Sequence, residues 1–300
     1  MKLVQTIKAI KKVKIQGAEN VATAALKALE SVTTNTKAKT KVQFLLEIKQ
    51  ANKMLFKSRP TEPEMRNYCN EILSFIKKFP ENDIQQVKHA AKEHIKHTLI
   101  KKQERKELLV KVGEIFLVNE IKKKNLIIYT HCHSSTVTSI IKKASKKKKI
   151  EVRNTETRPL FQGRTTAKEL ASVGIKVTHF VDAAMIEAIK DADLILTGAD
   201  AVTNTAVYNK IGSELLAQLA NHYHIPLYIC TSLWKYDAKK EQIEQRNPNE
   251  VWDHTPKNIH IQNPAFERIH IKHIKKFICE HGVLKSKKFF KQAKRTQSFL

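Results

Sequence analysis

Glycine and proline are scarce in this sequence, with 7 and 8 residues among 300. Low-complexity disorder and all-β architectures with many tight turns are rich in these residues, so both are disfavoured. Cysteine is also rare, and its four residues form no Cys-x-x-Cys pair: Cys69, Cys132, Cys230 and Cys279. This spacing is not that of a disulfide-rich protein, and we expect free thiols in a reducing cytoplasm.

Long apolar runs are absent as well. No stretch approaches the roughly 18 uninterrupted apolar residues that a membrane-spanning helix needs, so no membrane partner is predicted. Residues 1–15 mix apolar side chains with lysines and lack the apolar core of a signal peptide. These features predict a cytoplasmic protein.

Acidic residues are few relative to basic ones, at 29 against 55, which gives a formal net charge of +26. Such an excess attracts nucleic acid, anionic membranes or phosphorylated small molecules. The lysines are spread along the whole chain, which fits a general compositional bias equally well. Nucleic acid therefore stays open as a partner, and a true footprint should cluster on one face.

The first part of the chain has the apolar spacing of helices. Residues 21–29, 42–56 and 83–117 repeat apolar side chains every three or four positions, and the last of these predicts one long amphipathic helix. The segment Ser58-Arg59-Pro60-Thr61 breaks the pattern and predicts a loop. We predict a helical N-terminal domain over residues 1–122.

After residue 122 short apolar runs alternate with helical segments. Strands are predicted at 126–129, 150–152, 177–181, 194–196 and 227–230. Alternation of this kind is typical of a parallel sheet covered by helices on both faces. The predicted fold class is therefore α/β, with the helical N-terminal domain followed by a doubly wound, mostly parallel Rossmann-like sheet domain over residues 123–300.

Polar residues that follow the predicted strands are the candidates for chemistry, because ligands bind at the carboxyl ends of parallel strands. A helix N-terminus and nearby lysines favour the thiolate of Cys132, which could act as a base or a nucleophile. Desolvation after an apolar strand suits Asp200 to a general acid. Asn209 and Lys210, at the start of a predicted helix, suit a phosphate through the lysine charge and free N–H groups.

Each candidate also has an ordinary structural explanation. Cys132 fits a small buried core residue, Asp200 fits a helix cap or turn, and Arg59 fits a surface ion pair as well as a phosphate ligand. The stretch His131-Cys132-His133 does not predict a metal site, because neighbouring residues leaving a strand point to opposite faces and no fourth ligand is evident.

Eight short segments resemble a known family, which comprises the alpha, beta and delta subunits of eukaryotic initiation factor 2B, methylthioribose-1-phosphate isomerase and archaeal ribose-1,5-bisphosphate isomerase. They cover nearly the whole chain in the family's order. The segments are QGAENVATAAL at 16–26, SRPTEP at 58–63, THCHSS at 130–135, TETRPLFQGRTTAKELASVGI at 155–175, DLILTGADAV at 193–202, NKIGS at 209–213, RNPNEVW at 246–252 and NPAFERI at 263–269.

The archaeal ribose-1,5-bisphosphate isomerases look most similar, which implies an aldose–ketose isomerase of AMP and nucleoside metabolism. The resemblance implies Cys132 as proton acceptor and Asp200 as proton donor, with no cofactor and no metal. It also implies a homo-oligomer built on dimers through the C-terminal domain, a hexamer being one such assembly. The substrate-binding positions it implies are Gly17, Ala18, Arg59, Gln162, Asn209, Lys210 and Lys235.

Three departures from the family pattern keep an alternative open. Gln16 stands where the family has Arg, and His133 stands where Asn is usual. The loop after Asp200 is one residue shorter and lacks the usual Asn-Gly, which alters a turn beside that carboxylate. The alternative is a non-catalytic regulatory protein, similar to the initiation factor 2B subunits, that binds a nucleotide or a sugar phosphate.

Overall fold

The computed structural model describes residues 2–238 and 243–297, and the chain forms two compact units. The first comprises Met1–Arg105, Trp234–Tyr236 and Gln292–Leu300, and the second comprises Lys106–Leu233 and Asp237–Lys291. Compactness thus divides the chain at Arg105, whereas helices give way to strands at Asn125. The division at residue 122 stays a prediction for the folding domains.

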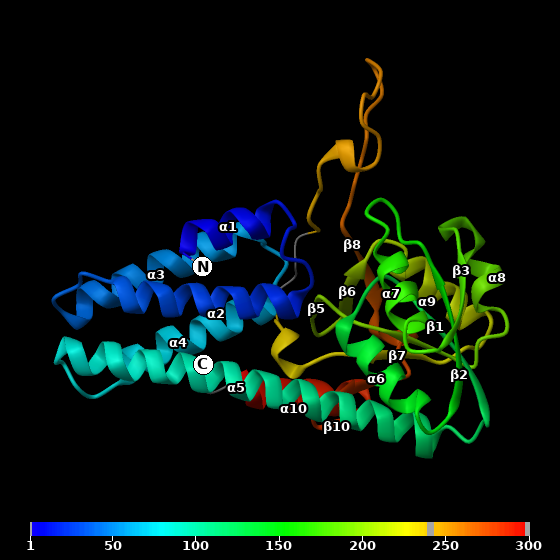
Figure 1. Ribbon diagram of the computed structural model, residues 1–300, viewed down its shortest axis with the longest axis horizontal. Coiled ribbons are helices and arrows are strands. Elements are labelled where there is room, and N and C mark those ends of the chain that lie inside the picture. Colours follow the sequence, from blue (N-terminus) through cyan, green and yellow to red (C-terminus); the bar gives the residue numbers. More distant parts are fainter. Residues whose placement is uncertain (1, 239–242, 298–300) are drawn as a thin grey trace. The chain divides into compact units, whose positions relative to one another are not determined.

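The first unit is helical, as the sequence predicts (Figure 1). Pro60 lies between two of its helices, in the predicted loop, and Pro63 is the first residue of the helix that follows, where the fixed φ of proline favours helix initiation. No helix among the described residues is long and apolar enough to cross a membrane. The helices are α1 (Leu3–Lys11), α2 (Ala18–Asn35), α3 (Lys41–Ser58), α4 (Pro63–Lys78) and α5 (Ile84–Ile115).

A distant segment completes the core of this unit. Trp234 stacks on Tyr68 of α4 with ring centroids 4.2 Å apart, and both side chains are buried. The amide of Asn67 donates to the carbonyl oxygens of Trp234 at 2.8 Å and Tyr236 at 3.0 Å. Two hydrogen bonds and one aromatic stack therefore fix residues that the sequence places far from the bundle.

The predicted long helix is present as α5, with a π-helical turn, η1 (Phe116–Glu120), directly after it. Val87, Ala91 and Ile95 of α5 belong to the core of the first unit. Farther along the same helix, Leu109 and Val110 belong to the core of the second unit. The single helix α5 thus contributes apolar side chains to two separate cores.

The second unit is built on a seven-stranded sheet in the order β10-β9-β7-β4-β1-β2-β3. All neighbours pair in parallel except β10, which pairs antiparallel with β9 at the edge. The doubly wound, mostly parallel sheet is confirmed. The strands are β1 (Asn125–Thr130), β2 (Lys149–Thr155), β3 (Lys176–Phe180), β4 (Leu194–Thr197), β7 (Leu227–Cys230), β9 (Lys276–Cys279) and β10 (Gly282–Leu284).

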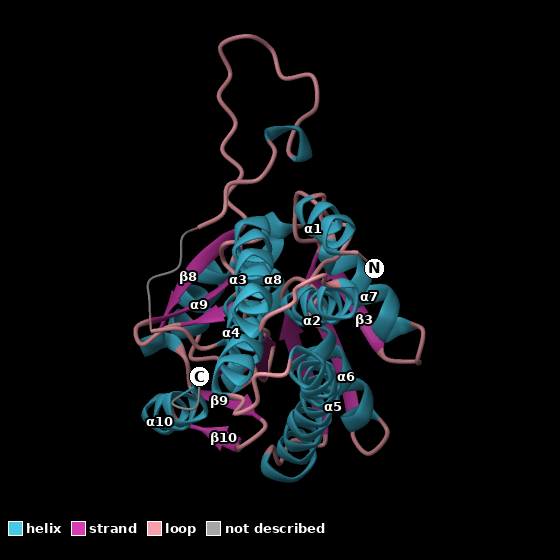
Figure 2. Cartoon of the chain, turned by 90° about the vertical axis from the view of Figure 1, so that its left-hand side faces the viewer, coloured by secondary structure: helices cyan, strands magenta, loops and turns pink. Residues whose placement is uncertain are grey.

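Helices pack on this sheet in two groups. Helices α6 and α7 contact each other and β2, and α7 also packs against β3 (Figure 2), whereas α8 contacts β2, β3 and α9. Every residue of β4 and β7 is buried, which explains why these strands read as continuous apolar runs. The helices are α6 (Ser135–Ser145), α7 (Gln162–Ala171), α8 (Met185–Ile189), α9 (Ser213–His222) and α10 (Ser286–Gln297), with short 3₁₀ turns η2 (Asp182–Ala184), η3 (Leu233–Lys235), η4 (Pro248–Glu250) and η5 (Ile271–His273).

A second, antiparallel sheet was not predicted. It contains β5 (Ala201–Val202), β6 (Ala206–Lys210) and β8 (Phe266–His270), in the order β5-β6-β8. The shortened loop after Asp200 is the tight turn of the β5–β6 hairpin, in which Thr203 N–H donates to the Ala206 carbonyl at 2.8 Å. The two residues of β5 are too few to show a period, and β6 (AVYNK) ends in polar residues that are buried only through its pairing with β8.

Gly163 allows α7 to begin hard against β2. A Cβ atom there would lie 1.8 Å from the Thr155 carbonyl oxygen, a distance that no side chain can adopt. The Gly163 N–H donates to the Glu156 carbonyl at 3.1 Å, and the Gly163 carbonyl accepts from Asn154 at 2.7 Å. The helix therefore starts five residues before the predicted 167, with glycine as the permitted residue at the contact.

We expect Gly163→Ala to lower the free energy of unfolding by roughly 3 kcal/mol, because the new methyl group must displace backbone rather than a flexible side chain. Thr165→Ala, at an exposed position of the same helical turn, is the matched control and should change it by no more than about 0.5 kcal/mol. Urea denaturation followed by circular dichroism measures both. Equal stability of the two variants would contradict the close contact.

Candidate active site

The strand order reverses between β1 and β4, because the chain first adds β2 and β3 on one side and then returns to the other. Ligands in open parallel sheets bind in the crevice at such a switch point, outside the carboxyl ends of the strands. The loops that leave β1 and β4 here are 131–134 and 198–200. The two loops contact each other closely at Gly198, because a Cβ atom there would lie 2.8 Å from the Ser134 hydroxyl oxygen.

Cys132 lies in the first of these loops with an unusual backbone. Its φ is +65°, in the left-handed region that costs a non-glycine residue on the order of 1 kcal/mol. Its N–H donates to the Thr157 hydroxyl at 3.1 Å, and its carbonyl accepts from the Thr166 hydroxyl at 2.8 Å. Cys132 is partly exposed, whereas the other three cysteines are buried. The expectation of an ordinary buried core cysteine therefore does not fit Cys132.

Asp200 begins the β5–β6 hairpin directly after β4. Its N–H donates to the Tyr208 carbonyl at 2.9 Å, and the residue is half-buried. The hairpin therefore positions the backbone of Asp200, and the alternative of a helix cap does not apply because β5 follows it.

Lys210 links the two candidates electrostatically. It ends β6 and is 8% exposed, and burial holds the pKa of its ammonium group below the ordinary value. In their ionised forms Cys132 and Asp200 act in the opposite direction and favour the charged lysine. Lys210, Cys132 and Asp200 thus lie close enough to interact, although they come from the end of β6 and from two separate loops.

Two more candidates in this unit have buried polar atoms with no hydrogen-bond partner among the residues that the structure describes. They are the amide nitrogen of Asn209, which is 6% exposed, and the amide oxygen of Gln162 at the first position of α7. A buried polar group without a hydrogen bond costs about 1–3 kcal/mol. One donor and one acceptor are therefore available to a polar ligand.

The other four candidates belong to the first unit. Gly17, with φ +80°, is the N-cap of α2, and Ala18 is the buried first residue of that helix. Arg59 follows α3, with its guanidinium Nε 3.7 Å from the buried carboxylate of Glu62. Lys235 is half-buried in η3. Their substrate-binding roles stay predictions.

The start of α9 offers fewer free N–H groups to a phosphate than the sequence suggests. The N–H groups of Gly212 and Glu214 both donate to the carboxylate of Glu267, at 2.9 and 2.8 Å. A carboxylate of the protein thus already occupies these donors. Local sequence patterns cannot reveal this contact, because Glu267 comes from β8, more than 50 residues later.

Three further side chains organise the loops around Cys132: Asp182, Thr157 and Thr166. Their roles were not predicted from the sequence. Asp182 accepts from the backbone N–H groups of Thr157 at 2.8 Å and Arg158 at 2.7 Å, so it fixes the loop after β2. Thr157 and Thr166 in turn hold Cys132. Threonine is too common to mark such a role in a sequence.

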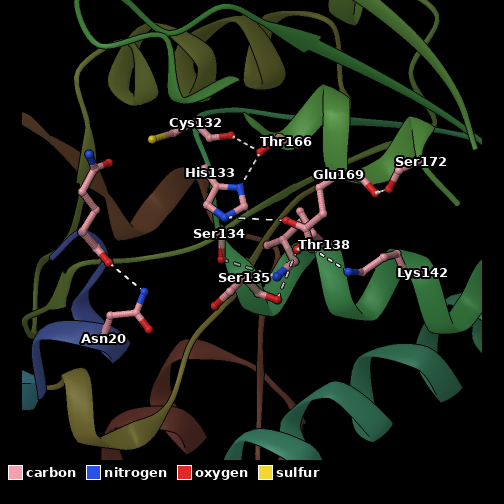
Figure 3. Close-up of polar contacts among 12 residues, drawn as sticks. Asn20, Cys132, His133, Ser134, Ser135, Thr138, Lys142, Thr166, Glu169 and Ser172 are labelled. Carbon is pink, nitrogen blue, oxygen red and sulfur yellow. Dashed lines mark hydrogen bonds and ion pairs between the residues drawn. The ribbon is translucent and has the colours of Figure 1, made fainter. Parts of the chain in front are cut away.

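The two histidines beside Cys132 make separate contacts. His131 is buried, and its Nε2 lies 2.8 Å from the Ile211 carbonyl, so Nε2 carries the hydrogen. His133 contacts Thr166 through Nδ1 at 3.1 Å (Figure 3). In the described ranges no three His, Cys, Asp or Glu side chains are grouped so that they could hold a metal ion.

Comparison with known proteins places the chain in a family. The model of the Initiation factor 2 subunit family matches residues 14–286. The ribose 1,5-bisphosphate isomerase of Pyrococcus furiosus is 35% identical over 292 residues, which cover 92% of this chain and 88% of that protein. The methylthioribose-1-phosphate isomerase of Desulforamulus reducens is 30% identical over 300 residues, covering 92% and 85%.

Solved structures share the fold. The crystal structure of translation initiation factor eIF-2B from Pyrococcus horikoshii OT3 matches with a TM-score of 0.80 and 24% identity, over 94% of this chain and 96% of that one. Helices followed by a mostly parallel, doubly wound sheet are thus the architecture of this class of protein. The chain belongs to the Initiation factor 2 subunit family, which confirms the resemblance read from its motifs.

We expect the protein to lose stability as the pH falls through the ordinary histidine pKa of about 6.5. Burial, with a smaller contribution from the Lys210 charge, holds the pKa of His131 below that value, although the Ile211 carbonyl and Asp182 oppose the shift. Above the ordinary value the imidazole is neutral in both states. Below it the unfolded chain binds a proton that the folded chain excludes, so folding is disfavoured.

Urea midpoints at about pH 7.5 and pH 5.5 measure this effect, with each unit of pKa difference corresponding to about 1.4 kcal/mol. His131→Gln keeps an N–H donor for Ile211 but cannot titrate, so its midpoint should depend less on pH. His222→Gln, at an exposed position, is the control and should match the wild type. Equal pH dependence in all three proteins would argue against a neutral buried His131.

Proposed function

We propose that this chain is an aldose–ketose isomerase, an intramolecular oxidoreductase that converts ribose-1,5-bisphosphate to ribulose-1,5-bisphosphate. The observation that carries the proposal is the placement of Cys132 and Asp200 in the loops after β1 and β4, at the switch point of the sheet. Buried Lys210 ends the adjoining strand β6, near enough for both groups in their ionised forms to raise its pKa. The names of the P. furiosus and D. reducens relatives, both isomerases of phosphorylated sugars, support the reaction class.

The reaction needs a base, an acid and a cation. An aldose 1-phosphate is a closed ring, which must open before hydrogen can move from carbon 2 to carbon 1. Carbon 2 is oxidised and carbon 1 is reduced within one molecule, so the electrons balance without a cofactor. In our proposal Asp200 donates a proton to the ring oxygen as the ring opens, and the Cys132 thiolate accepts the carbon 2 proton and passes it to carbon 1. The proton of the carbon 2 hydroxyl returns to Asp200, so the protons balance.

Lys210 suits the charge that develops between these groups. Loss of the carbon 2 proton gives an enolate-like species, and a cation in a desolvated site stabilises such an anion more strongly than one in water. Burial of Lys210 supplies this desolvation. The free amide groups of Asn209 and Gln162 suit the hydroxyl groups of the sugar.

A non-catalytic regulator that binds a nucleotide or sugar phosphate is the second candidate. Gln16, in place of the family's Arg, favours it, because one phosphate-facing guanidinium is missing. A direct assay separates the candidates: purified protein is incubated with ribose-1,5-bisphosphate or methylthioribose-1-phosphate, and ketose formation is followed by NMR. Binding of a sugar phosphate with no turnover of either would favour the regulator.

We expect Cys132→Ser and Asp200→Asn each to reduce kcat by roughly 10²–10⁴, the usual worth of a positioned base or acid. KM should stay nearly unchanged, because each replacement keeps the shape but cannot exchange the proton. Lys210→Ala should also raise KM, since it removes a cation that binds the ground state. Steady-state kinetics on ribose-1,5-bisphosphate measures all three.

Lys149→Ala is the matched control for Lys210→Ala, because Lys149 is exposed at the amino end of β2. It should leave both constants unchanged. Full turnover in Cys132→Ser would show that the assigned mechanism is wrong, although the family assignment would survive.

The association of the chain with itself is a separate proposal. Family resemblance implies a homo-oligomer built on dimers through the C-terminal domain, and two-fold interfaces are the commonest arrangement of soluble oligomers. Light scattering at micromolar concentration should therefore give at least twice the chain mass of 34.4 kDa. A mass equal to one chain would refute the prediction.

A further inference from the structure

The two peptide groups of Cys132 are each held by a threonine hydroxyl from the loop and helix that follow β2. The Cys132 N–H donates to the hydroxyl oxygen of Thr157, and that hydroxyl donates its own hydrogen to the Thr155 carbonyl at 3.4 Å. On the other side the hydroxyl of Thr166 donates to the Cys132 carbonyl. Each hydroxyl therefore has a fixed direction, and both bonds act on a residue in the left-handed region.

His133 fixes the direction of the Thr166 hydroxyl. Because Thr166 spends its only hydrogen on the Cys132 carbonyl, its oxygen must accept from Nδ1 of His133, 3.1 Å away. Nδ1 of the imidazole therefore carries a hydrogen. A change at His133 would reach the Cys132 carbonyl through one intervening hydroxyl.

Charged residues of two helices surround the far side of the His133 imidazole. Nε2 of His133 lies 3.7 Å from Glu169 of α7, and Glu169 also accepts from Lys142 at 2.6 Å and Thr138 at 3.0 Å, both on α6 (Figure 3). Burial opposes the ionised Glu169, but these hydrogen bonds still hold its pKa below the ordinary value. Thr138 and Lys142 thus hold the Glu169 carboxylate in its position beside His133.

We infer that Thr157 and Thr166, the latter oriented by His133, are positioning residues that hold Cys132 in its left-handed conformation and so direct its thiol. Left-handed backbone is strained for a residue with a Cβ, and it persists only where the surroundings enforce it. Without the hydroxyls the peptide groups are free to return to an ordinary conformation, which would swing the thiol away. The catalytic consequence rests on the proposed function, whereas the thiol geometry does not.

The test compares Thr166→Val with Thr138→Val. Both replace a buried hydroxyl by a methyl group in the same network, but only Thr166 bonds to Cys132. In Thr166→Val we expect kcat on ribose-1,5-bisphosphate to fall by roughly 10²-fold, the loss that a slightly misplaced catalytic group produces. KM should stay within about twofold of wild type. Thr166→Ser, which restores the hydroxyl, should recover most of the rate.

A second readout needs no substrate. Cys132 is the one cysteine of four that is not buried, so iodoacetamide should alkylate it selectively, with peptide mass spectrometry following the rate at one fixed pH. Because the thiolate reacts and the Lys210 cation attracts it, a displaced thiol should react roughly tenfold more slowly. Slower alkylation in Thr166→Val, with the wild-type rate in Thr138→Val and Thr166→Ser, supports the inference.

The outcomes separate the two proposals. If wild type turns over no sugar phosphate but Thr166→Val still slows alkylation, the proposed function fails and the positioning role stands. Equal kcat and equal alkylation rates in Thr166→Val and Thr138→Val overturn the positioning role, whatever the function. If Thr166→Val does not fold, two variants of His133 replace it in the test. His133→Asn keeps a side-chain N–H donor, whereas His133→Leu lacks one. Indistinguishable alkylation rates in these two variants would likewise overturn the positioning role.

Discussion

The reversal of strand order between β1 and β4 is the constraint on which the candidate site depends. The two strands pair in parallel, with Ile128 opposite Leu194, so their carboxyl ends emerge side by side. Ligands of open parallel sheets bind at such a point, outside the carboxyl ends of the strands. The two loops still meet closely, because Gly198 has no side chain to push against Ser134. Cys132 and Asp200 stand in these loops, and Lys210 of the adjoining hairpin interacts with both.

Cross-loop hydrogen bonds then give these loops a defined geometry. Asp182 holds the loop after β2, Thr157 of that loop holds Cys132, and Glu267 holds the start of α9. Each bond satisfies backbone donors that would otherwise be unpaired where strands and helices end. Two carboxylates that could be taken for acids or bases are therefore structural. The chemistry that we propose uses the thiol of Cys132 and the carboxylate of Asp200, whose backbone groups are held by Thr157 and Tyr208.

The sequence predicted those features that follow from a long or strong local pattern. The spacing of apolar residues predicted α5, and the apolar run before Asp200 predicted β4, because burial on both faces of a parallel sheet demands such a run. It could not predict β5, which has two residues, or the pairing of β6 with β8, which joins segments far apart in the chain. Cys132 and Asp200 could be found because they follow strands. Their threonine and carboxylate neighbours could not, since those contacts exist only after folding.

The three departures from the family pattern differ in how much they alter the candidate site. The missing Asn-Gly removes a turn that favours left-handed backbone, yet the β5–β6 hairpin closes through the Thr203–Ala206 hydrogen bond and keeps Asp200 bonded to Tyr208. His133 likewise keeps a hydrogen-bond donor beside Thr166. Neither change removes a group that the proposed proton transfers use. Gln16 differs, because an amide cannot replace the charge of a guanidinium toward a phosphate. The remaining difference between an isomerase and a regulator of this family therefore concerns phosphate binding more than the proton-transfer groups.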